Sequence, residues 1–413
     1  MSPWSVLAAA MIAGTAVAAI GQAYPTLAPY IRTDLKLSLA AVGLLNTFIY
    51  IGTMLGALPA GWLTDWLGSR TLLIGGSVAA AVLAVAIPLL THTELVFVPL
   101  LMLMGLVVAS STPAGSQAVA QSFPPARRGL VIGLRQMAVP LGGALAAAIL
   151  PAVANSFGWR WASGVAAVLA VLAAFLVARL YYERIPAKPI SRTQAPSLAR
   201  ALSEPNILLV AVAGATLPTG QFVMITYLIL FLKEHFGVPE LTGAALLTAA
   251  QFAGAFSRVF WSWLSDHTGG QRKPWLVLIV TLAALSALML AWLPLGTPLW
   301  VKAIIVTLYG ATALGWQGLH FSLLTELSPP GLEGRVVGFG LVFTSIGIAS
   351  APPLFGLLVD SSGSYGLGWV IQAAVFGLGA MLLWNVQERK GAEGTEQRAE
   401  GSNVKDSPCS RGE

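Results

Sequence analysis

Apolar stretches of about 20 residues recur along the whole chain, from Trp4 to about Val386, and we count twelve of them. Each is long enough to cross the hydrocarbon core of a bilayer, which is roughly 30 Å thick. The chain is also 56% hydrophobic and only 10% charged, whereas a soluble protein carries roughly a quarter charged residues. Water is therefore not its only solvent.

The stretches are expected to be helices, because lipid offers no hydrogen-bond partners to a backbone and the short alternating pattern of barrel strands is missing. This predicts an all-α polytopic membrane protein with twelve transmembrane helices. The N-terminal apolar run lacks a basic region ahead of it and continues toward Tyr30. We therefore expect it to remain as the first helix and not to be a cleaved signal peptide.

Basic residues explain the net charge of +6 and gather in alternate loops. By the positive-inside rule, the side with more Lys and Arg is cytoplasmic. This predicts a multi-pass protein of the cytoplasmic membrane with both termini cytoplasmic, lipid as its surroundings and no nucleic-acid partner. The cytoplasmic set is Arg70, Arg127, Arg128, Arg184, Lys188, Arg192, Arg200, Arg272, Lys273, Arg335, Arg389 and Lys390, against Arg32, Lys36, Arg160, Lys233 and Lys302 on the other side.

The chain contains an internal repeat on either side of a Pro-, Ser- and Arg-rich stretch. GWLTDWLGSR, from Gly61, matches WSWLSDHTGGQR, from Trp261, and QSFPPARRG, from Gln121, matches ELSPPGLEGR, from Glu326. The repeat predicts two pseudo-symmetric six-helix bundles. The expected domains are 1–183 and 206–386, joined by a cytoplasmic linker at 184–205 and followed by a disordered tail at 387–413.

The segment from Gly61 to Arg70 resembles the G-x-x-x-D-[RK]-x-G-[RK]-[RK] signature of the major facilitator superfamily. It departs from that signature at Trp66 and Ser69, where basic residues are usual. A degenerate second copy follows at the symmetric place, and the resemblance covers residues 1 to about 386. It implies a secondary transporter whose two bundles rock about a midplane site. The first, fourth, seventh and tenth helices would line the pathway, and the second, fifth, eighth and eleventh would form the bundle interface.

Acidic and basic residues at the ends of helices can pair with neighbouring helix ends in one conformation and release them in another. The two signature loops are therefore predicted to act as a conformational gate. The alternative is that the two aspartates merely satisfy local amides. The gate residues are Gly61, Asp65, Gly68, Arg70, Asp266 and Arg272.

Polar side chains in the middle of predicted helices are candidates for substrate binding. In the tenth helix, Tyr309, Thr312, Trp316 and His320 recur at helical spacing and form one stripe. The alternative for each candidate is an interhelical hydrogen bond, which is common in membranes. The candidates from these helices are Gln22, Tyr24, Asn46, Tyr50, Gln117, Gln221, Tyr227, Gln251, Trp316, Gln317 and His320.

His320 is the one histidine placed well within a predicted membrane helix. An ordinary histidine titrates near neutral pH, so His320 is a candidate carrier of a coupling proton. The alternative, which we favour, is a hydrogen-bonding bridge between helices.

Arg258 lies in FSRVFWSWLSD, within an apolar run, and a charge there costs a few kcal/mol by insertion scales. Helical spacing places it on one face with Gln251, Gly254 and Ser262, so it is predicted to face inward. Arg135 is a second membrane arginine. No Asp or Glu occurs in the middle of any predicted helix.

Two cations without carboxylate counterions favour an anionic substrate. The position of Arg258 also resembles that of the substrate-binding arginine in the eighth helix of nitrate porters, monocarboxylate transporters and the oxalate/formate exchanger. The alternative is that Arg258 caps helix carbonyls or pairs with Glu326. The sequence therefore predicts a secondary active transporter, expected to be a monomer, that moves a small anionic metabolite, a carboxylate above all, with or without protons.

The competing function is a proton-coupled exporter of drugs or other lipophilic metabolites. Val139 to Gly143 partly resembles the G-P-x-x-G-G motif of such exporters, but Gly142, Gly143 and Ala146 also fit simple close packing of helices. A sensor would be expected to carry a signalling domain. We find no phosphate loop, metal-ligand cluster or catalytic triad, which argues against an enzyme, a cofactor or a metal. The single cysteine, Cys409, excludes an intrachain disulfide.

Overall fold

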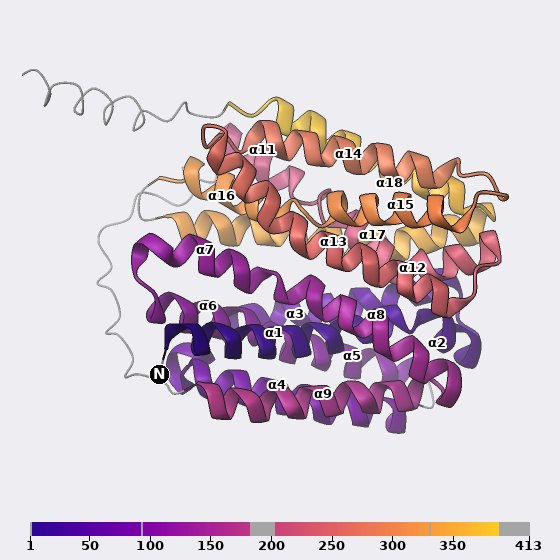
Figure 1. Ribbon diagram of the computed structural model, residues 1–413, viewed down its shortest axis with the longest axis horizontal. Helices are drawn as coiled ribbons and strands as arrows, with labels where there is room; N and C mark the ends of the chain where they lie inside the picture. Colours follow the sequence, from indigo (N-terminus) through magenta and orange to yellow (C-terminus); the bar gives the residue numbers. More distant parts are fainter. Residues whose placement is uncertain (1, 92–93, 182–202, 330–331, 388–413) are drawn as a thin grey trace, which may run out of the picture.

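The computed structural model describes residues 2–91, 94–181, 203–329 and 332–387, and every regular element in these segments is an α-helix (Figure 1). The all-α prediction is confirmed. The predicted linker lies almost entirely outside the described residues, as do the tail after Gln387 and Cys409.

The two halves of the chain contain corresponding series of helices. In residues 2–181 these are α1 (Pro3–Thr26), α2 (Ala28–Leu35), α3 (Leu39–Leu67), α4 (Ser69–Leu90), α5 (Glu94–Ala109), α6 (Ser111–Ser122), α7 (Pro125–Gln136), α8 (Ala138–Phe157) and α9 (Trp159–Leu180). In residues 203–387 they are α11 (Pro205–Ala213), α12 (Thr219–Phe236), α13 (Glu240–His267), α14 (Lys273–Ala291), α15 (Leu299–Ala313), α16 (Gln317–Leu327), α17 (Glu333–Ser362) and α18 (Tyr365–Trp384).

Ten helical segments of the described residues are long and apolar enough to cross a membrane. The other two predicted crossings are the α11–α12 pair and α13. A turn at 214–218 interrupts the pair, leaving α11 only 9 residues long. α13 has 28 residues but includes Arg258, Asp266 and His267, which lower its hydropathy.

Several predicted helices are interrupted in the middle, which the apolar pattern did not indicate. The fourth crossing breaks at Ser110, between α5 and α6, and the tenth breaks at 314–316, between α15 and α16. These crossings occupy equivalent places in the repeat. Each break leaves backbone carbonyls without their usual helical partners, so polar groups become available at membrane depth.

Single glycines reverse the chain between two pairs of helices. Gly68, at φ 82°, separates α3 from α4, and Gly158, at φ 87°, separates α8 from α9. Other residues rarely adopt this backbone conformation. Glycine at these positions therefore permits one-residue connections between long helices.

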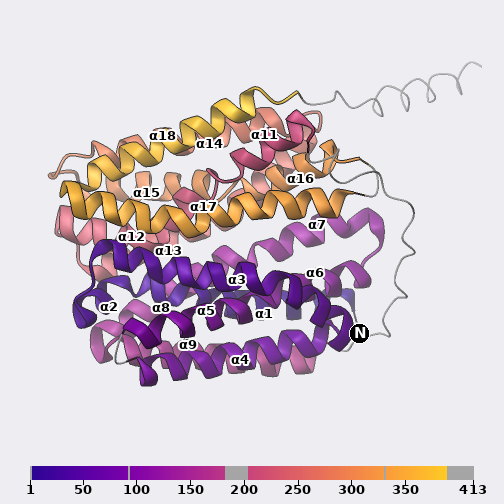
Figure 2. The same cartoon turned by 180° about the vertical axis from the view of Figure 1, so that it is seen from behind.

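The helices of each half pack mainly with one another (Figures 1 and 2). In the first half α1 packs on α8 and α4 on α9, and in the second half α14 packs on α18 and α13 on α15. The halves meet along two helix pairs, α3 with α17 and α8 with α13. These are the second, eleventh, fifth and eighth crossings, the four expected at the bundle interface.

The segment from Val139 to Gly143, which partly resembles an exporter motif, lies in α8 and packs closely against α1. A Cβ on Gly142 would lie 2.4 Å from the carbonyl oxygen of Thr15 in α1. Gly142 therefore allows α8 to approach α1, as small residues do between membrane helices.

The start of α1, the start of α11 and the end of α18 lie at one end of the molecule, which we call the linker end (Figure 1). α2 and the C-terminal end of α12 lie at the opposite end, which we call the far end.

Candidate functional site

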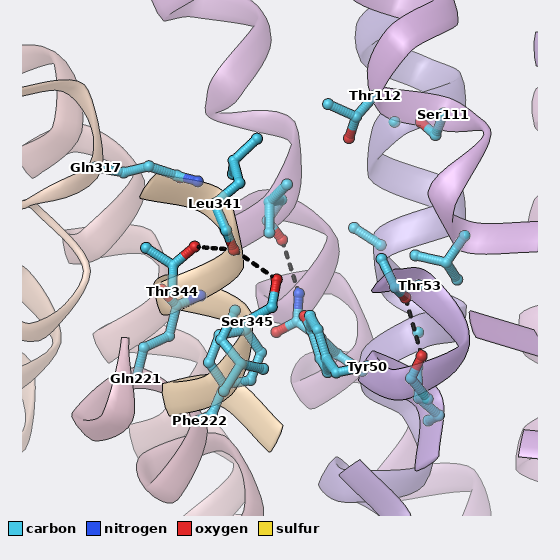
Figure 3. Close-up of a pocket in the computed structure, with 18 of the residues that line it drawn as sticks. Tyr50, Thr53, Ser111, Thr112, Gln221, Phe222, Gln317, Leu341, Thr344 and Ser345 are labelled. Atoms are coloured by element: carbon cyan, nitrogen blue, oxygen red, sulfur yellow. Dashed lines mark hydrogen bonds between the residues drawn. The ribbon is translucent and has the colours of Figure 1, made fainter. Parts of the chain in front are cut away.

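A cavity of about 210 Å³ lies between the two halves, and we call it the central cavity. The first half lines it with residues of α1, α3, α5, α6 and α8, and the second half with residues of α12, α13, α16 and α17 (Figure 3). On α1 the lining extends from Gly14 to Gln22, in the middle of the helix and toward its far end.

Contacts between the halves close the far side of the cavity. The carboxylate of Asp360, in α17, accepts hydrogen bonds from the backbone N–H groups of Leu39 (3.1 Å) and Ala40 (2.8 Å), the first two residues of α3. The hydroxyl of Tyr227, in α12, lies 2.7 Å from the carbonyl oxygen of Leu39 and 2.8 Å from that of Pro352. Its single proton is shared between these two acceptors.

An ion pair between Arg32 of α2 and Glu234 of α12 also joins the halves, and Tyr365 donates a hydrogen bond of 2.8 Å to Glu234. We call these contacts of Asp360, Tyr227 and the Arg32–Glu234 pair the far-end seal. The central cavity lies on the linker side of this seal.

The guanidinium of Arg258 lines the central cavity and is 4% exposed. Its Nε donates to the carbonyl oxygen of Leu314 (3.1 Å), which the break between α15 and α16 leaves available. Its Nη1 donates to the carbonyl oxygen of Gln136 (3.1 Å), and its Nη2 donates to Oε1 of Gln221 (3.3 Å). Arg258 thus faces inward and contacts both halves.

All three acceptors of Arg258 are neutral. A guanidinium has five N–H donors, so these contacts leave two of them for another acceptor. Among the described residues that line the cavity there is no Asp or Glu. The positive charge at this wall is therefore hydrogen bonded but not neutralised, which favours an anion in the cavity.

Arg135 lies behind the cavity wall, outside the described lining residues. It is 4% exposed, and its Nη1 would lie 3.1 Å from a Cβ on Gly115, so this glycine of α6 provides room for it. Its Nη2 donates to Oε1 of Gln136 (2.5 Å), and its Nε has no partner among the described residues. Gln136 therefore connects the two buried arginines, through its side chain to Arg135 and through its backbone to Arg258.

Two glutamines link the halves beside the cavity. Gln22 donates to the carbonyl oxygen of Val139 (2.9 Å) and accepts a hydrogen bond of 2.9 Å from Nε2 of Gln251. A Cβ on Gly143 would lie 2.1 Å from Nε2 of Gln251 and 2.3 Å from Oε1 of Gln22. The pair exists because α8 has no side chain at this position.

The structure places the predicted substrate-binding residues in two groups. The residues that line the central cavity are Gln22, Tyr50, Gln221, Arg258, Trp316 and Gln317. The residues outside its described lining are Tyr24, Asn46, Arg135, Gln117, Tyr227, Gln251 and His320.

Several residues of the second group make interhelical hydrogen bonds. The hydroxyl of Tyr24 lies 3.1 Å from that of Ser163. Asn46 donates to the carbonyl oxygen of Ile348 (3.2 Å), and Gln117 accepts from Ser69 (2.8 Å). These contacts fit the alternative interpretation given to such residues in the sequence.

His320 is fully buried within the second half. A Cβ on Gly214 would lie 2.9 Å from its Nε2, so the ring packs against the turn that separates α11 from α12. Its neighbours Trp316 and Phe321 line the cavity, while His320 is directed away from it. Neither ring nitrogen has a hydrogen-bond partner among the described residues, so the hydrogen-bonding bridge favoured from the sequence is not observed among them.

The first-half gate residues lie at the linker end. Arg70 donates to the carbonyl oxygens of Tyr181 (2.5 Å) and Ala178 (2.9 Å), at the end of α9. Gly68 makes the turn between α3 and α4, and a Cβ on Gly61 would meet nothing within 4 Å. Asp65 lies in the last turn of α3, and its side chain is outside the described part of the structure.

The second-half gate residues, Asp266 at the end of α13 and Arg272 just before α14, form a cluster with Glu326 of α16. Arg272 pairs with Asp266, and its Nε donates to Oε1 of Glu326 (2.9 Å). Burial lowers the pKa of Arg272, but the hydrogen bonds to Glu326 and Asp266 outweigh it and leave the pKa raised. Glu326 is thus a partner of Arg272 and not of Arg258. The acceptors of Arg258 are the carbonyl oxygens of Leu314 and Gln136 and the side chain of Gln221.

Sequence reasoning missed part of the cavity lining. The eleventh crossing was expected at the bundle interface, yet α17 also contributes Thr344 and Ser345 to the cavity. The available signal was a pair of hydroxyl residues in the middle of an apolar helix. The missed lining residues include Phe321. They also include Thr53, Ser111, Thr112, Phe222, Thr344 and Ser345 (Figure 3).

Comparison with known proteins assigns the fold and the family. The sequence profile described as the Major Facilitator Superfamily matches residues 6–351. An uncharacterized MFS-type transporter of Mycobacterium tuberculosis is 30% identical over 368 residues, which cover 89% of this chain and 81% of that protein.

Two further relatives have functional names. The "Probable sulfoacetate transporter SauU" of Cupriavidus necator is 26% identical, with 86% of each chain covered. An "MFS-type efflux pump" of Mycolicibacterium smegmatis is 26% identical, with 88% of this chain and 87% of that protein covered. Among solved structures, a bacterial homolog of the human lysosomal transporter Spinster, inward-facing and unoccupied, superposes with a TM-score of 0.74. It is 16% identical and covers 92% of this chain and 96% of its own.

Proposed function

The chain belongs to the major facilitator superfamily, a family of membrane transporters and not of enzymes, and we propose that its cargo is a small anionic metabolite of the carboxylate class. The proposal also takes the transporter to work as a monomer by alternating access, with or without accompanying protons.

One observation carries the proposal: Arg258 presents a buried cation, with two N–H groups left, to a cavity whose described lining has no carboxylate. A planar guanidinium matches a carboxylate in a two-pronged arrangement. The name of the Cupriavidus necator relative supports an anionic cargo, since sulfoacetate is an anion.

The far-end seal and the central cavity support a mechanism in which the two halves move relative to each other. We take residues 1–183 and 206–386 as the moving bodies. Asp65 and Arg70 in one half, with Asp266 and Arg272 in the other, would act as the gate at the linker end. If both termini are cytoplasmic, as the loop charges predict, then the cavity faces the cytoplasm in this conformation.

The second candidate is export of a lipophilic compound. It is favoured by the relative named as an efflux pump and by the aromatic side chains of Tyr50, Phe222, Trp316 and Phe321 in the cavity lining. Such a pump would bind the apolar surface of its substrate. Because many lipophilic substrates carry a positive charge, a cationic side chain in the cavity would not be needed to bind them.

A thermal-shift screen of the purified protein separates the two candidates. The panel contains short carboxylates, inorganic anions and lipophilic cations. Since a ligand that binds only the folded state raises the melting temperature, stabilisation by carboxylates is expected. Stabilisation by lipophilic cations alone would exclude the anion proposal.

Variants at Arg258 test the site itself. Arg258→Gln should lose carboxylate affinity by on the order of 2 kcal/mol or more, or about 30-fold, because a charge-assisted contact is lost. Arg258→Lys should recover little of it, since an ammonium lacks the planar fork. Arg335→Gln is the matched control, because it removes one positive charge at an exposed position of α17.

The alternative role of Arg258 gives the opposite pattern. If the arginine serves only to hold Leu314, Gln136 and Gln221, then Arg258→Gln would keep its carboxylate affinity and lose melting temperature without ligand. Equilibrium binding to all four proteins, with melting temperatures measured beside it, decides between the two roles.

A further inference from the structure

A second cavity, of about 450 Å³, opens on the outer surface of the contact between α3 and α17. We call it the lateral groove. α3 lines it with residues that include Tyr50, Ile51 and Met54, and α17 with residues that include Ser345, Ile346 and Ser350.

The lip of the lateral groove is apolar and outward-facing. Met54 is 44% exposed and Ile346 51% exposed, on helices of a membrane protein, so both side chains face lipid. The serine and threonine hydroxyls in the groove are occupied internally. Ser350 donates to the carbonyl oxygen of Ile346 (2.8 Å), Ser345 to that of Leu341 (2.7 Å) and Thr47 to that of Ala349 (2.5 Å). The groove therefore accepts hydrocarbon and offers little to a polar ligand.

The lateral groove adjoins the central cavity. Tyr50 and Ser345 line both, so their side chains belong to the wall that separates the two. Both residues are labelled in the close-up of the central cavity (Figure 3). On the cavity side, the ring of Tyr50 packs edge-on against Phe222, with 4.6 Å between ring centroids. Phe222 follows Gln221, the side-chain acceptor of Arg258.

We propose that the transported anion is amphipathic, with its carboxylate at Arg258 and an unbranched hydrocarbon tail that enters the lateral groove when the side chain of Tyr50 turns aside. A straight-chain fatty acid longer than butyrate fits this description, because each methylene removed from water is stabilised in an apolar site. This inference rests on the proposed function, since it assumes that Arg258 binds the carboxylate.

The test is a chain-length series of straight-chain carboxylates, from acetate to decanoate, bound to the detergent-solubilised protein. In the wild type, affinity should rise about three- to fourfold per added methylene beyond butyrate. Ser350→Phe fills the groove at a residue outside the lining of the central cavity, and it removes only a hydrogen bond within α17. It should keep the affinity for acetate and butyrate and lose the gain with length.

Leu378→Phe is the control, because it enlarges a 48%-exposed side chain on α18, away from the groove. It should behave like the wild type. A second variant, Ala349→Leu, narrows the groove by a smaller volume and keeps the result interpretable if Ser350→Phe has a lowered melting temperature.

Two results would overturn the inference: no dependence on chain length in the wild type, or the same dependence in Ser350→Phe as in Leu378→Phe, which would indicate partition into detergent. A different result would show that the proposed function itself is wrong. In that case acetate and butyrate would bind Arg258→Gln as well as they bind the wild type, whatever the chain-length series shows.

Discussion

At the scale of single residues, His320 is unusual because buried polar groups are normally hydrogen bonded. Its ring has no partner among the described residues, and it packs against Gly214 and toward Gly340, away from the central cavity. A proton carried on this ring would therefore not meet the cargo directly. We expect that His320 is not the obligatory proton carrier.

The substitution His320→Gln tests this expectation. In proteoliposomes, uptake of the strongest-binding carboxylate driven by a pH gradient should persist at a rate comparable to that of the wild type. His267→Gln, at an exposed position of α13, is the control. Loss of uphill uptake in His320→Gln alone, with binding and melting temperature retained, would show that the histidine carries the proton.

Arg258 shows how far the sequence predicts the placement and the contacts of a single residue. Helical spacing was enough to predict that Arg258 faces inward, but the sequence left open its pairing with Glu326, which in the structure contacts Arg272. The acceptors of Arg258 were not predictable. The carbonyl of Leu314 is available only because the helix breaks there, and Gln136 reaches Arg258 only through the contact between the halves. The sequence likewise gave no sign that Gly143 makes room for the Gln22–Gln251 pair.

At the scale of helices, the start of α3 is held by the opposite half. The first N–H groups of a helix have no partners within it and carry a partial positive charge, so a carboxylate is stabilising there. In this protein the carboxylate comes from Asp360, at the end of α17. The contact can exist only while the far end is closed, so it favours the present conformation over one that opens to the far side.

Replacement of Asp360 by Asn keeps the shape of the side chain and removes its charge. The expected loss is about 0.3–2 kcal/mol of preference for the closed far end. The measurement is a distance distribution between spin labels at Phe157→Cys and Leu295→Cys, exposed positions at the far end of each half, in a Cys409→Ser background. Asp360→Asn should shift this distribution toward longer distances.

Asp34→Asn is the matched control for this experiment. Asp34 is also a far-end carboxylate, but its partners Trp159 and Arg160 belong to its own half. If both variants shift the distribution equally, or if neither does, the contact between Asp360 and α3 does not select the conformation.

The number and order of the long helices could be predicted from apolar length, but their interruptions could not. Apolar length measures only whether a segment can cross lipid, and the breaks at Ser110 and 314–316 lie inside segments that pass this test. The short helix α2 was also missed. Its mixed polar sequence lies at the end of the first apolar run, where pattern alone did not separate helix from loop.

At the scale of the whole molecule, the internal repeat and the loop charges lead to one expectation about topology. The start of α1, the start of α11 and the end of α18 lie together at the linker end (Figure 2). Most Lys and Arg residues of the connecting segments belong to this end by sequence. Because basic loops stay on the cytoplasmic side, we expect the linker end to be cytoplasmic and the central cavity to be accessible from the cytoplasm in this conformation.

The single native cysteine, Cys409, follows the end of α18 and provides the measurement. A membrane-impermeant maleimide should label Cys409 in inverted vesicles and after permeabilisation, and not in intact cells. The control is Leu295→Cys in a Cys409→Ser background, which places the cysteine at an exposed far-end position. It should be labelled in intact cells and not in sealed inverted vesicles. Labelling of Cys409 from outside intact cells would show that the protein has the opposite orientation in the membrane. The central cavity would then face outward, and the far-end seal would close the cytoplasmic side.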